Sequence, residues 1–155
     1  MALTAVCVLV GQLVGTIILS QDNAGSLLKV DYDIKNLTPG LHGFHIHEYG
    51  DIRNNCLAAG AHFNPYHKEH GSPTDENRHV GDFGNINANS DGVAKLVDTF
   101  NATLFGEYSV IGRAIVVHSK QDDLGQGGNE ESKKTGNAGS RVDCCVIGIG
   151  VGQSG

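Results

Sequence analysis

The sequence has few basic residues and no long run of the residues that build helices. No stretch of Ala, Leu, Glu and Lys carries caps at both ends, which argues against an α-helical bundle. Only 11 Lys and Arg oppose 17 Asp and Glu among 155 residues, and the formal charge is −6. The basic residues form no phosphate-binding stripe, so we expect no nucleic-acid partner.

The apolar N-terminus lacks the charge pattern of a secretory signal. The first basic side chain is Lys29, so no basic segment precedes the apolar residues. Glycine and glutamine interrupt this stretch, whereas a membrane helix needs about 20 apolar residues. Its Val, Ile and Thr residues favour strands. We therefore expect strands at 3–10 and 14–20, a retained N-terminus and no membrane partner, with a signal peptide or membrane helix as the alternative.

Glycine is abundant, with 22 residues in turn-like positions, about twice its usual share. Asp91-Gly92 predicts a hairpin turn. Further strands are expected at 27–34, 41–47, 82–88, 93–100, 113–118 and 142–149. The sequence therefore predicts an all-β domain of eight strands, a sandwich or barrel that spans residues 1–155.

Two connections are longer than a compact domain normally needs. Residues 48–80 make 33 residues, and residues 119–141 make 23. Such loops are usually functional or disordered. Histidines lie within the first loop and directly before the second, so we expect both loops to be functional.

Histidines at two-residue spacing suggest a metal site. His45 and His47 share one face of an expected strand. Alone, such a pair is more often structural, but further candidate ligands follow it: His62, His70, His79, Asp82 and His118. Three imidazoles and one carboxylate suit tetrahedral zinc, while four imidazoles suit copper. Seven residues fill both sites if His62 binds one metal through each ring nitrogen.

Five segments carry a resemblance to a known family: GFHIHEYGD, AGAHFNPYHKEHG, RHVGDFGNI, DDLGQGGNEESKKTGNAGSR and CVIGIG. Together they resemble copper/zinc superoxide dismutase of the cytosolic eukaryotic type, over essentially the whole chain. The resemblance implies an immunoglobulin-like Greek-key sandwich and an antioxidant enzyme that converts superoxide to oxygen and hydrogen peroxide. It also implies a cytoplasmic homodimer with one copper and one zinc ion per subunit, loaded with the help of a copper chaperone.

The same resemblance implies a role for each site residue. Copper would bind His45, His47, His62 and His118; zinc would bind His62, His70, His79 and Asp82. His62 would bridge the metals and take part in proton transfer, and Asp122 would tie a copper ligand to a zinc ligand. Arg141 would position the superoxide anion. The segment from His118 to Arg141 carries as many basic as acidic residues, so the net charge of −6 lies elsewhere.

The cysteines at 7, 56, 144 and 145 allow three fully paired arrangements. The resemblance implies a disulfide between Cys56 and Cys144. Adjacent strand residues face opposite sides, so only one of Cys144 and Cys145 should reach Cys56, and a Cys56–Cys145 bridge stays open. Cys7, among apolar residues, is expected to be a buried free thiol.

Other features leave alternatives. The first turn is unusually apolar at Val10 and Val14 and could add a contact surface. His42 is expected to pack or hydrogen-bond, and His67 to be exposed. Competing functions are a non-enzymatic copper chaperone, a secreted dismutase, and a sandwich binding module that holds only structural zinc.

Overall fold

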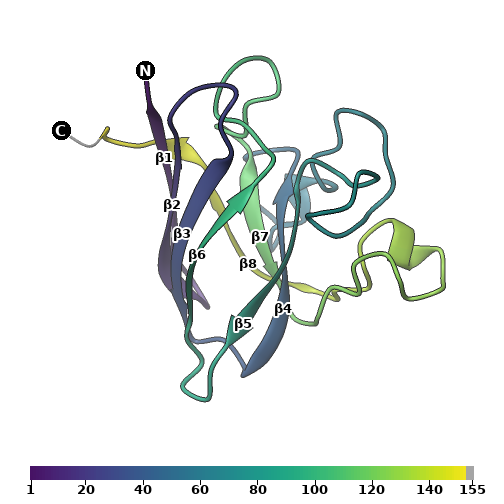
Figure 1. Ribbon diagram of the computed structural model, residues 1–155. Coiled ribbons are helices and arrows are strands. Elements are labelled where there is room, and N and C mark those ends of the chain that lie inside the picture. Colours follow the sequence, from purple (N-terminus) through teal and green to yellow (C-terminus); the bar gives the residue numbers. More distant parts are fainter. Residues whose placement is uncertain (153–155) are drawn as a thin grey trace.

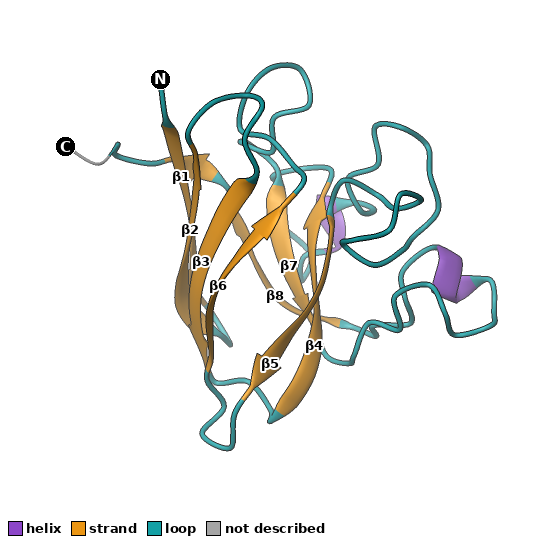
Figure 2. Ribbon diagram, viewed as in Figure 1, coloured by secondary structure: helices purple, strands orange, loops and turns teal. Residues whose placement is uncertain are grey.

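The computed structural model describes residues 1–152, which form two antiparallel sheets packed face to face (Figure 1). The first sheet has the order β6 (Ala94–Phe100), β3 (Leu28–Lys35), β2 (Val14–Gln21), β1 (Leu3–Val10) and β9 (Gly148–Ile149). The second has the order β5 (Asp82–Ala88), β4 (Gly40–His47), β7 (Ala114–His118) and β8 (Arg141–Val146). The helices of this described part are two single 3₁₀ turns, η1 (Leu57–Ala59) and η2 (Glu131–Lys133) (Figure 2).

Alternating side chains fill the space between the sheets. In β3, Leu28, Val30, Tyr32 and Ile34 are buried, with charged residues between them. Phe44 and Ile46 of β4 face the same interior, and the rings of Phe83 and Phe100 stack across from one sheet to the other with centroids 4.0 Å apart. The strand order is that of a Greek key, because β4, β5 and β6 follow one another and β7 returns beside β4.

Residues 1–152 contain nine strands, which corrects the predicted number of eight. The segment expected as one strand over 142–149 divides at Ile147, whose buried side chain lies where the chain leaves the second sheet for the first. The Ile147 N–H donates to the Arg113 carbonyl at 2.8 Å, and β9 then pairs with β1. The hairpin turn at Asp91-Gly92 is present, with Gly92 at a φ of 75° that favours glycine.

Residues 3–21 form β1 and β2, as expected, with Cys7, Leu9, Ile17 and Leu19 in the sandwich interior. None of the helices described between residues 1 and 152 has the length and hydrophobicity needed to cross a bilayer.

The two long loops both cover the outer face of the second sheet. They span 48–81 and 119–140, between β4 and β5 and between β7 and β8. Figure 1 shows both on the side of the molecule away from β1 and β2. The His70 N–H of the first loop donates to the Lys133 carbonyl of the second at 2.8 Å. The outer face of β4 and β7 therefore becomes buried.

All four cysteines are paired. Cys144 faces the first long loop and forms a disulfide with Cys56, while Cys145 faces the sandwich interior and forms a disulfide with Cys7. The prediction of a free Cys7 thiol is therefore wrong. The sequence shows that Cys144 and Cys145 face opposite sides, but it does not show that β1 lies opposite β8.

Candidate metal centre

Strand alternation places three histidines on the outer face of the second sheet. Phe44 and Ile46 point into the core, so His45 and His47 point outward, beneath the loops. β7 pairs with β4 and brings His118 to the same face. All three side chains are buried.

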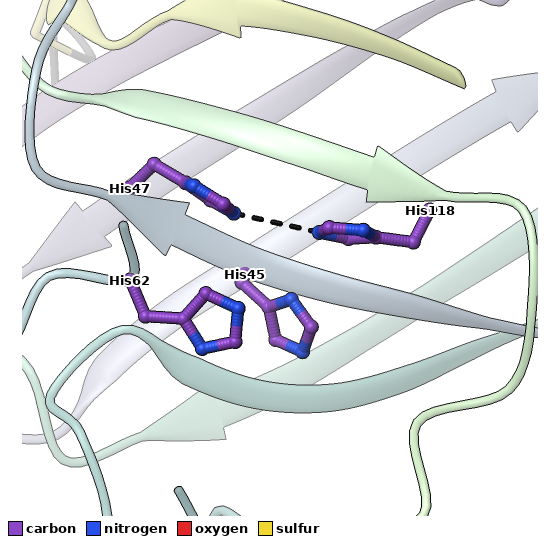
Figure 3. Close-up of side chains that lie close together, drawn as sticks. All are labelled: His45, His47, His62 and His118. Carbon is purple, nitrogen blue, oxygen red and sulfur yellow. Dashed lines mark hydrogen bonds between the residues drawn. The ribbon is translucent and has the colours of Figure 1, made fainter. Parts of the chain in front are cut away.

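The first loop returns alongside β4 and adds His62. The Phe63 N–H donates to the Ile46 carbonyl at 2.8 Å, and His47 and His62 form an isolated bridge. Figure 3 shows His45, His47, His62 and His118 gathered around one space, with the Nε2 atoms of His47 and His118 3.4 Å apart. One ring nitrogen from each of these residues lies within 4.8 Å of the others.

Hydrogen bonds fix which nitrogen of each ring faces this space. The Nδ1–H of His47 donates to the Gly60 carbonyl at 2.8 Å, so its Nε2 lone pair is free. The Nδ1–H of His118 donates to the Gly139 carbonyl at 3.3 Å, with the same result. His45 donates through Nε2, to Asp122, and therefore keeps Nδ1 free.

A second quartet contains His62, His70, His79 and Asp82. Asp82 Oδ1 lies 3.0, 2.8 and 3.2 Å from the Nδ1 atoms of His62, His70 and His79. The other oxygen of Asp82 accepts the N–H groups of Gly71 and His79, which fixes the carboxylate. His62 is thus common to both quartets, with one ring nitrogen on each side.

Asp122 connects the two quartets from outside. Its Oδ2 accepts the Nε2–H of His45 and its Oδ1 accepts the Nε2–H of His70, each at 2.7 Å, and the carboxylate is fully buried. Both rings must therefore hold their proton on Nε2, because a carboxylate only accepts. The Nδ1 lone pairs of both rings are left facing the quartets, as metal ligation requires.

The donor atoms fit metal ions. In the second quartet, a tetrahedral zinc with bonds of about 2.0–2.1 Å requires ligand atoms roughly 3.3 Å apart. The measured 2.8–3.2 Å falls within a few tenths of that separation. In the first quartet, His45 Nδ1 and His62 Nε2 are buried with no hydrogen-bond partner among the described residues. Buried polar atoms without partners are costly, and a metal ion would satisfy them.

The electrostatics also suit metal binding. Burial, followed by the neighbouring imidazoles, lowers the pKa of His45, and burial lowers the pKa of His118 to about 4. Burial also lowers the pKa of His62, although its contact with the Asp82 carboxylate acts in the opposite direction. These rings are neutral near pH 7, as metal ligation demands. Burial also opposes the charge on His70, but its hydrogen bonds to the Asp122 and Asp82 carboxylates raise its pKa to about 9, so a metal ion at the second quartet would displace the proton from His70 Nδ1.

The first quartet opens to solvent through a cavity of about 1310 Å³ lined by His47, His62 and His118. Six cationic side chains line it, namely Lys68, Arg113, Lys120, Lys133, Lys134 and Arg141. Four carboxylates oppose them: Glu48, Glu69, Glu107 and Glu131. The cavity is therefore net positive in a chain of net charge −6.

Arg141 is held at this opening by the first loop. Its guanidinium donates to the carbonyls of Cys56 and Gly60, at 2.8 and 2.6 Å. The charge balance predicted for the active-site segment covered residues 118–141 only. It did not include Lys68 and Arg113, which reach the cavity from distant segments. No local motif marks them, because the fold alone brings them there.

The two remaining histidines lie where they were expected. His42 is buried, with its ring nitrogens 2.8 and 2.7 Å from the carbonyl oxygens of His118 and Thr38, so it hydrogen-bonds within the structure. His67 is exposed at the rim of the cavity.

Comparison with known families agrees with this geometry. The family model described as Copper/zinc superoxide dismutase (SODC) matches residues 13–147, most of the 155-residue chain. The family binds copper and zinc, and the two histidine clusters that share His62 fit such a pair of ions. The chain therefore belongs to the copper/zinc superoxide dismutase family, oxidoreductases that convert superoxide to oxygen and hydrogen peroxide.

Proposed function

We propose that copper binds His45, His47, His62 and His118, that zinc binds His62, His70, His79 and Asp82, and that His62 bridges the two. The observation that carries this assignment is the arrangement of the His62 ring. Its Nδ1 lies 3.0 Å from Asp82 in the second quartet, while its buried Nε2 faces the first without a partner. Four imidazoles suit copper, and three imidazoles with a carboxylate suit tetrahedral zinc.

Bound copper supplies one-electron redox chemistry, and zinc, which has none, keeps the His62 ring in place. His62 is the residue placed to hold a proton at Nε2 and pass it to the reduced substrate, because this atom faces the cavity side and the other nitrogen is engaged by the second quartet. Loops 48–81 and 119–140 keep the rings out of bulk solvent. We propose these loops as the metal-binding loop and the electrostatic loop of a single domain.

Arg141 is proposed to hold superoxide beside the first quartet. Two carbonyl acceptors fix its guanidinium at the cavity, and the surplus of cationic side chains there attracts a small anion. The acidic remainder of the surface disfavours approach elsewhere. This position gives the residue a role in orienting substrate as well as in attraction.

Arg141→Glu tests this role. Dismutation should slow by roughly 10-fold or more at low salt, with the difference shrinking as salt rises, while copper and zinc content stay close to one each. Arg53→Glu is the matched control. It makes the same change in charge at a residue with a side chain 82% exposed and paired only with Asp51. Equal loss of activity and metal in Arg141→Glu, or equal slowing in Arg53→Glu, would contradict the proposal.

The chain is also proposed to act as a homodimer through an apolar edge. Val8, Val146 and Ile149 are 48%, 40% and 80% exposed on β1, β8 and β9, and Ile52 is exposed nearby in the first loop. Apolar surface of this kind marks protein contacts. Sedimentation should show a dimer that Val8→Lys weakens, whereas Thr99→Lys on the opposite edge strand β6 should leave it intact.

We also propose that the protein is cytoplasmic, that it acts in antioxidant defence, and that a copper chaperone helps to load its metal. The sequence motifs that resemble the cytosolic eukaryotic type support these three proposals. Cell fractionation tests the location. Metal content after expression with and without a copper chaperone tests the loading route. Copper and zinc with superoxide-dependent turnover would favour the enzyme, and zinc alone without turnover would favour a binding module.

A further inference from the structure

A disulfide adds a covalent link between the two sheets along one side of the sandwich. On the side of β5 and β6, a hairpin at residues 89–93 joins the two sheets through the chain itself. On the other side β1 and β8 face each other without pairing, and the chain joins the sheets there as well, through Ile147 between β8 and β9. We call this side the β1/β8 seam.

Cys7–Cys145 crosses the middle of the seam. The two Cα atoms lie 5.5 Å apart, and the residues are 0% and 3% exposed within the main core. Hydrogen bonds lie on either side of this cross-link. The Leu13 N–H donates to Asp143 Oδ2 of β8 at 3.0 Å at one end, and at the other the Gly150 N–H donates to the Thr4 carbonyl at 2.8 Å, which extends the β9–β1 pairing within the first sheet.

The second disulfide, Cys56–Cys144, uses the residue next to Cys145 but links β8 to the first loop. Cys144 faces outward and binds Cys56, in a small cluster with Ala59, Ala114 and Val116 beneath the first loop. The Cys56 carbonyl accepts a hydrogen bond from Arg141. The Cys56–Cys144 bond therefore holds the loop and the cavity arginine, and the Cys7–Cys145 bond holds the sheets.

We propose that Cys7–Cys145 is a permanent staple of the sandwich, which lets Cys56–Cys144 be reduced and re-formed while the chain stays folded. A cross-link stabilises by limiting the unfolded chain, and Cys7–Cys145 joins residues 138 apart. The constraint from Cys7–Cys145 remains when Cys56–Cys144 is cut. A reductant reaches Cys56–Cys144 when a loop opens, whereas Cys7–Cys145 requires the sheets to separate.

A dithiol can act as the reductant of the Cys56–Cys144 disulfide. The dithiol gives two electrons and two protons to the Cys56–Cys144 bond, which becomes two thiols, while the dithiol closes into its own disulfide. Reoxidation by an oxidised dithiol reverses the step. Loop mobility, and with it the position of Arg141, is then the property that the exchange controls.

The test uses the metal-loaded protein equilibrated with increasing dithiothreitol, then alkylated and mapped by mass spectrometry. Cys56 and Cys144 should become alkylated at a concentration at least about tenfold below that which releases Cys7 and Cys145, and the protein should still unfold cooperatively in between. Release of Cys7 and Cys145 at the same or a lower concentration overturns the proposal.

Variants separate the two bonds. Cys56→Ser/Cys144→Ser should fold with Cys7–Cys145 formed, and an unfolded chain or free Cys7 and Cys145 thiols would refute the staple. In Cys7→Ala/Cys145→Ala, reduction of the remaining disulfide should lower the melting temperature more than the same reduction lowers it in the parent protein. An equal decrease in both proteins would also refute it. If this variant does not fold, the order in which the cysteines of the parent protein become alkylated tests the proposal.

Discussion

Replacing Asp122 with asparagine tests how one buried carboxylate serves two metal sites. The carboxylate accepts a hydrogen bond from the His45 ring through one oxygen and from the His70 ring through the other, each at 2.7 Å. An asparagine has the same shape but only one accepting oxygen. Its amide group must therefore face one of the two Nε2–H groups, donor against donor.

The size of the effect follows from that lost acceptor. A hydrogen bond to a charged group contributes about 1.5–3 kcal/mol, more when the group left behind is buried. The ring that faces the amide can avoid this donor–donor contact by moving its proton to Nδ1, but Nδ1 is the atom that faces the metal quartet. We therefore expect Asp122→Asn to lower the affinity for at least one of the two metals by about 10-fold to 100-fold.

Competition with a chelator, read separately for copper and for zinc, measures this loss. Asp123→Asn is the matched control, because Asp123 lies in the same loop and bonds Ser132 and Asn137 but no histidine ring. Melting of the metal-free proteins shows whether the loop change affects the fold itself. Unchanged affinity for both metals in Asp122→Asn, or an equal loss in Asp123→Asn, would show that the carboxylate does not control the rings.

Two further predictions concern stability. Burial, and then the Asp98 carboxylate, raises the pKa of Tyr32 from 10.0 to about 12, so the folded state holds this proton more tightly than the unfolded chain does. The free energy of unfolding should therefore fall, by at most a few kcal/mol, as pH rises from about 10 to 12. Urea unfolding should show a smaller decrease in Tyr32→Phe, and an identical decrease would contradict this. Asp143→Ala removes the acceptor of the Leu13 N–H and should cost about 1–3 kcal/mol, a decrease of several degrees in melting temperature, whereas Asp31→Ala on the exposed face of β3 should change little.

Strand positions could be predicted because the alternation of side chains is local. β1 and β5 have the predicted bounds, β3 is shifted by one residue at both ends, and the other strands before residue 120 differ by one residue at one end. The division of the last strand was not predictable in this way. Gly148 and Ile149 join the first sheet because the chain crosses at Ile147, and that crossing depends on contacts with Gly112 and Arg113, far away in the sequence.

The members of the metal centre were also suggested by spacing, since His45 and His47 must share a face. The tautomers of these histidine rings could not be predicted from spacing. The free nitrogen of His47 is set by the Gly60 carbonyl and that of His118 by the Gly139 carbonyl, and both acceptors lie in the long loops. Loop backbone positions have no periodic signal in the sequence. For the same reason Lys68 and Arg113 gave no indication that they line the cavity.

The pairing of the cysteines depends on contacts between segments that are distant in the sequence. Alternation established that Cys144 and Cys145 face opposite sides of one strand, and it would place Cys145 in the interior once Cys144 faces the loop. Cys7 was expected in the apolar interior as a free thiol, while Cys145 was left as an alternative partner of Cys56. The missing step was that β1 and β8 lie opposite each other across the seam, which follows from the order of strands in two sheets. A pair of interior cysteines on strands that face each other from opposite sheets should therefore be considered a candidate cross-link before either is taken as a free thiol.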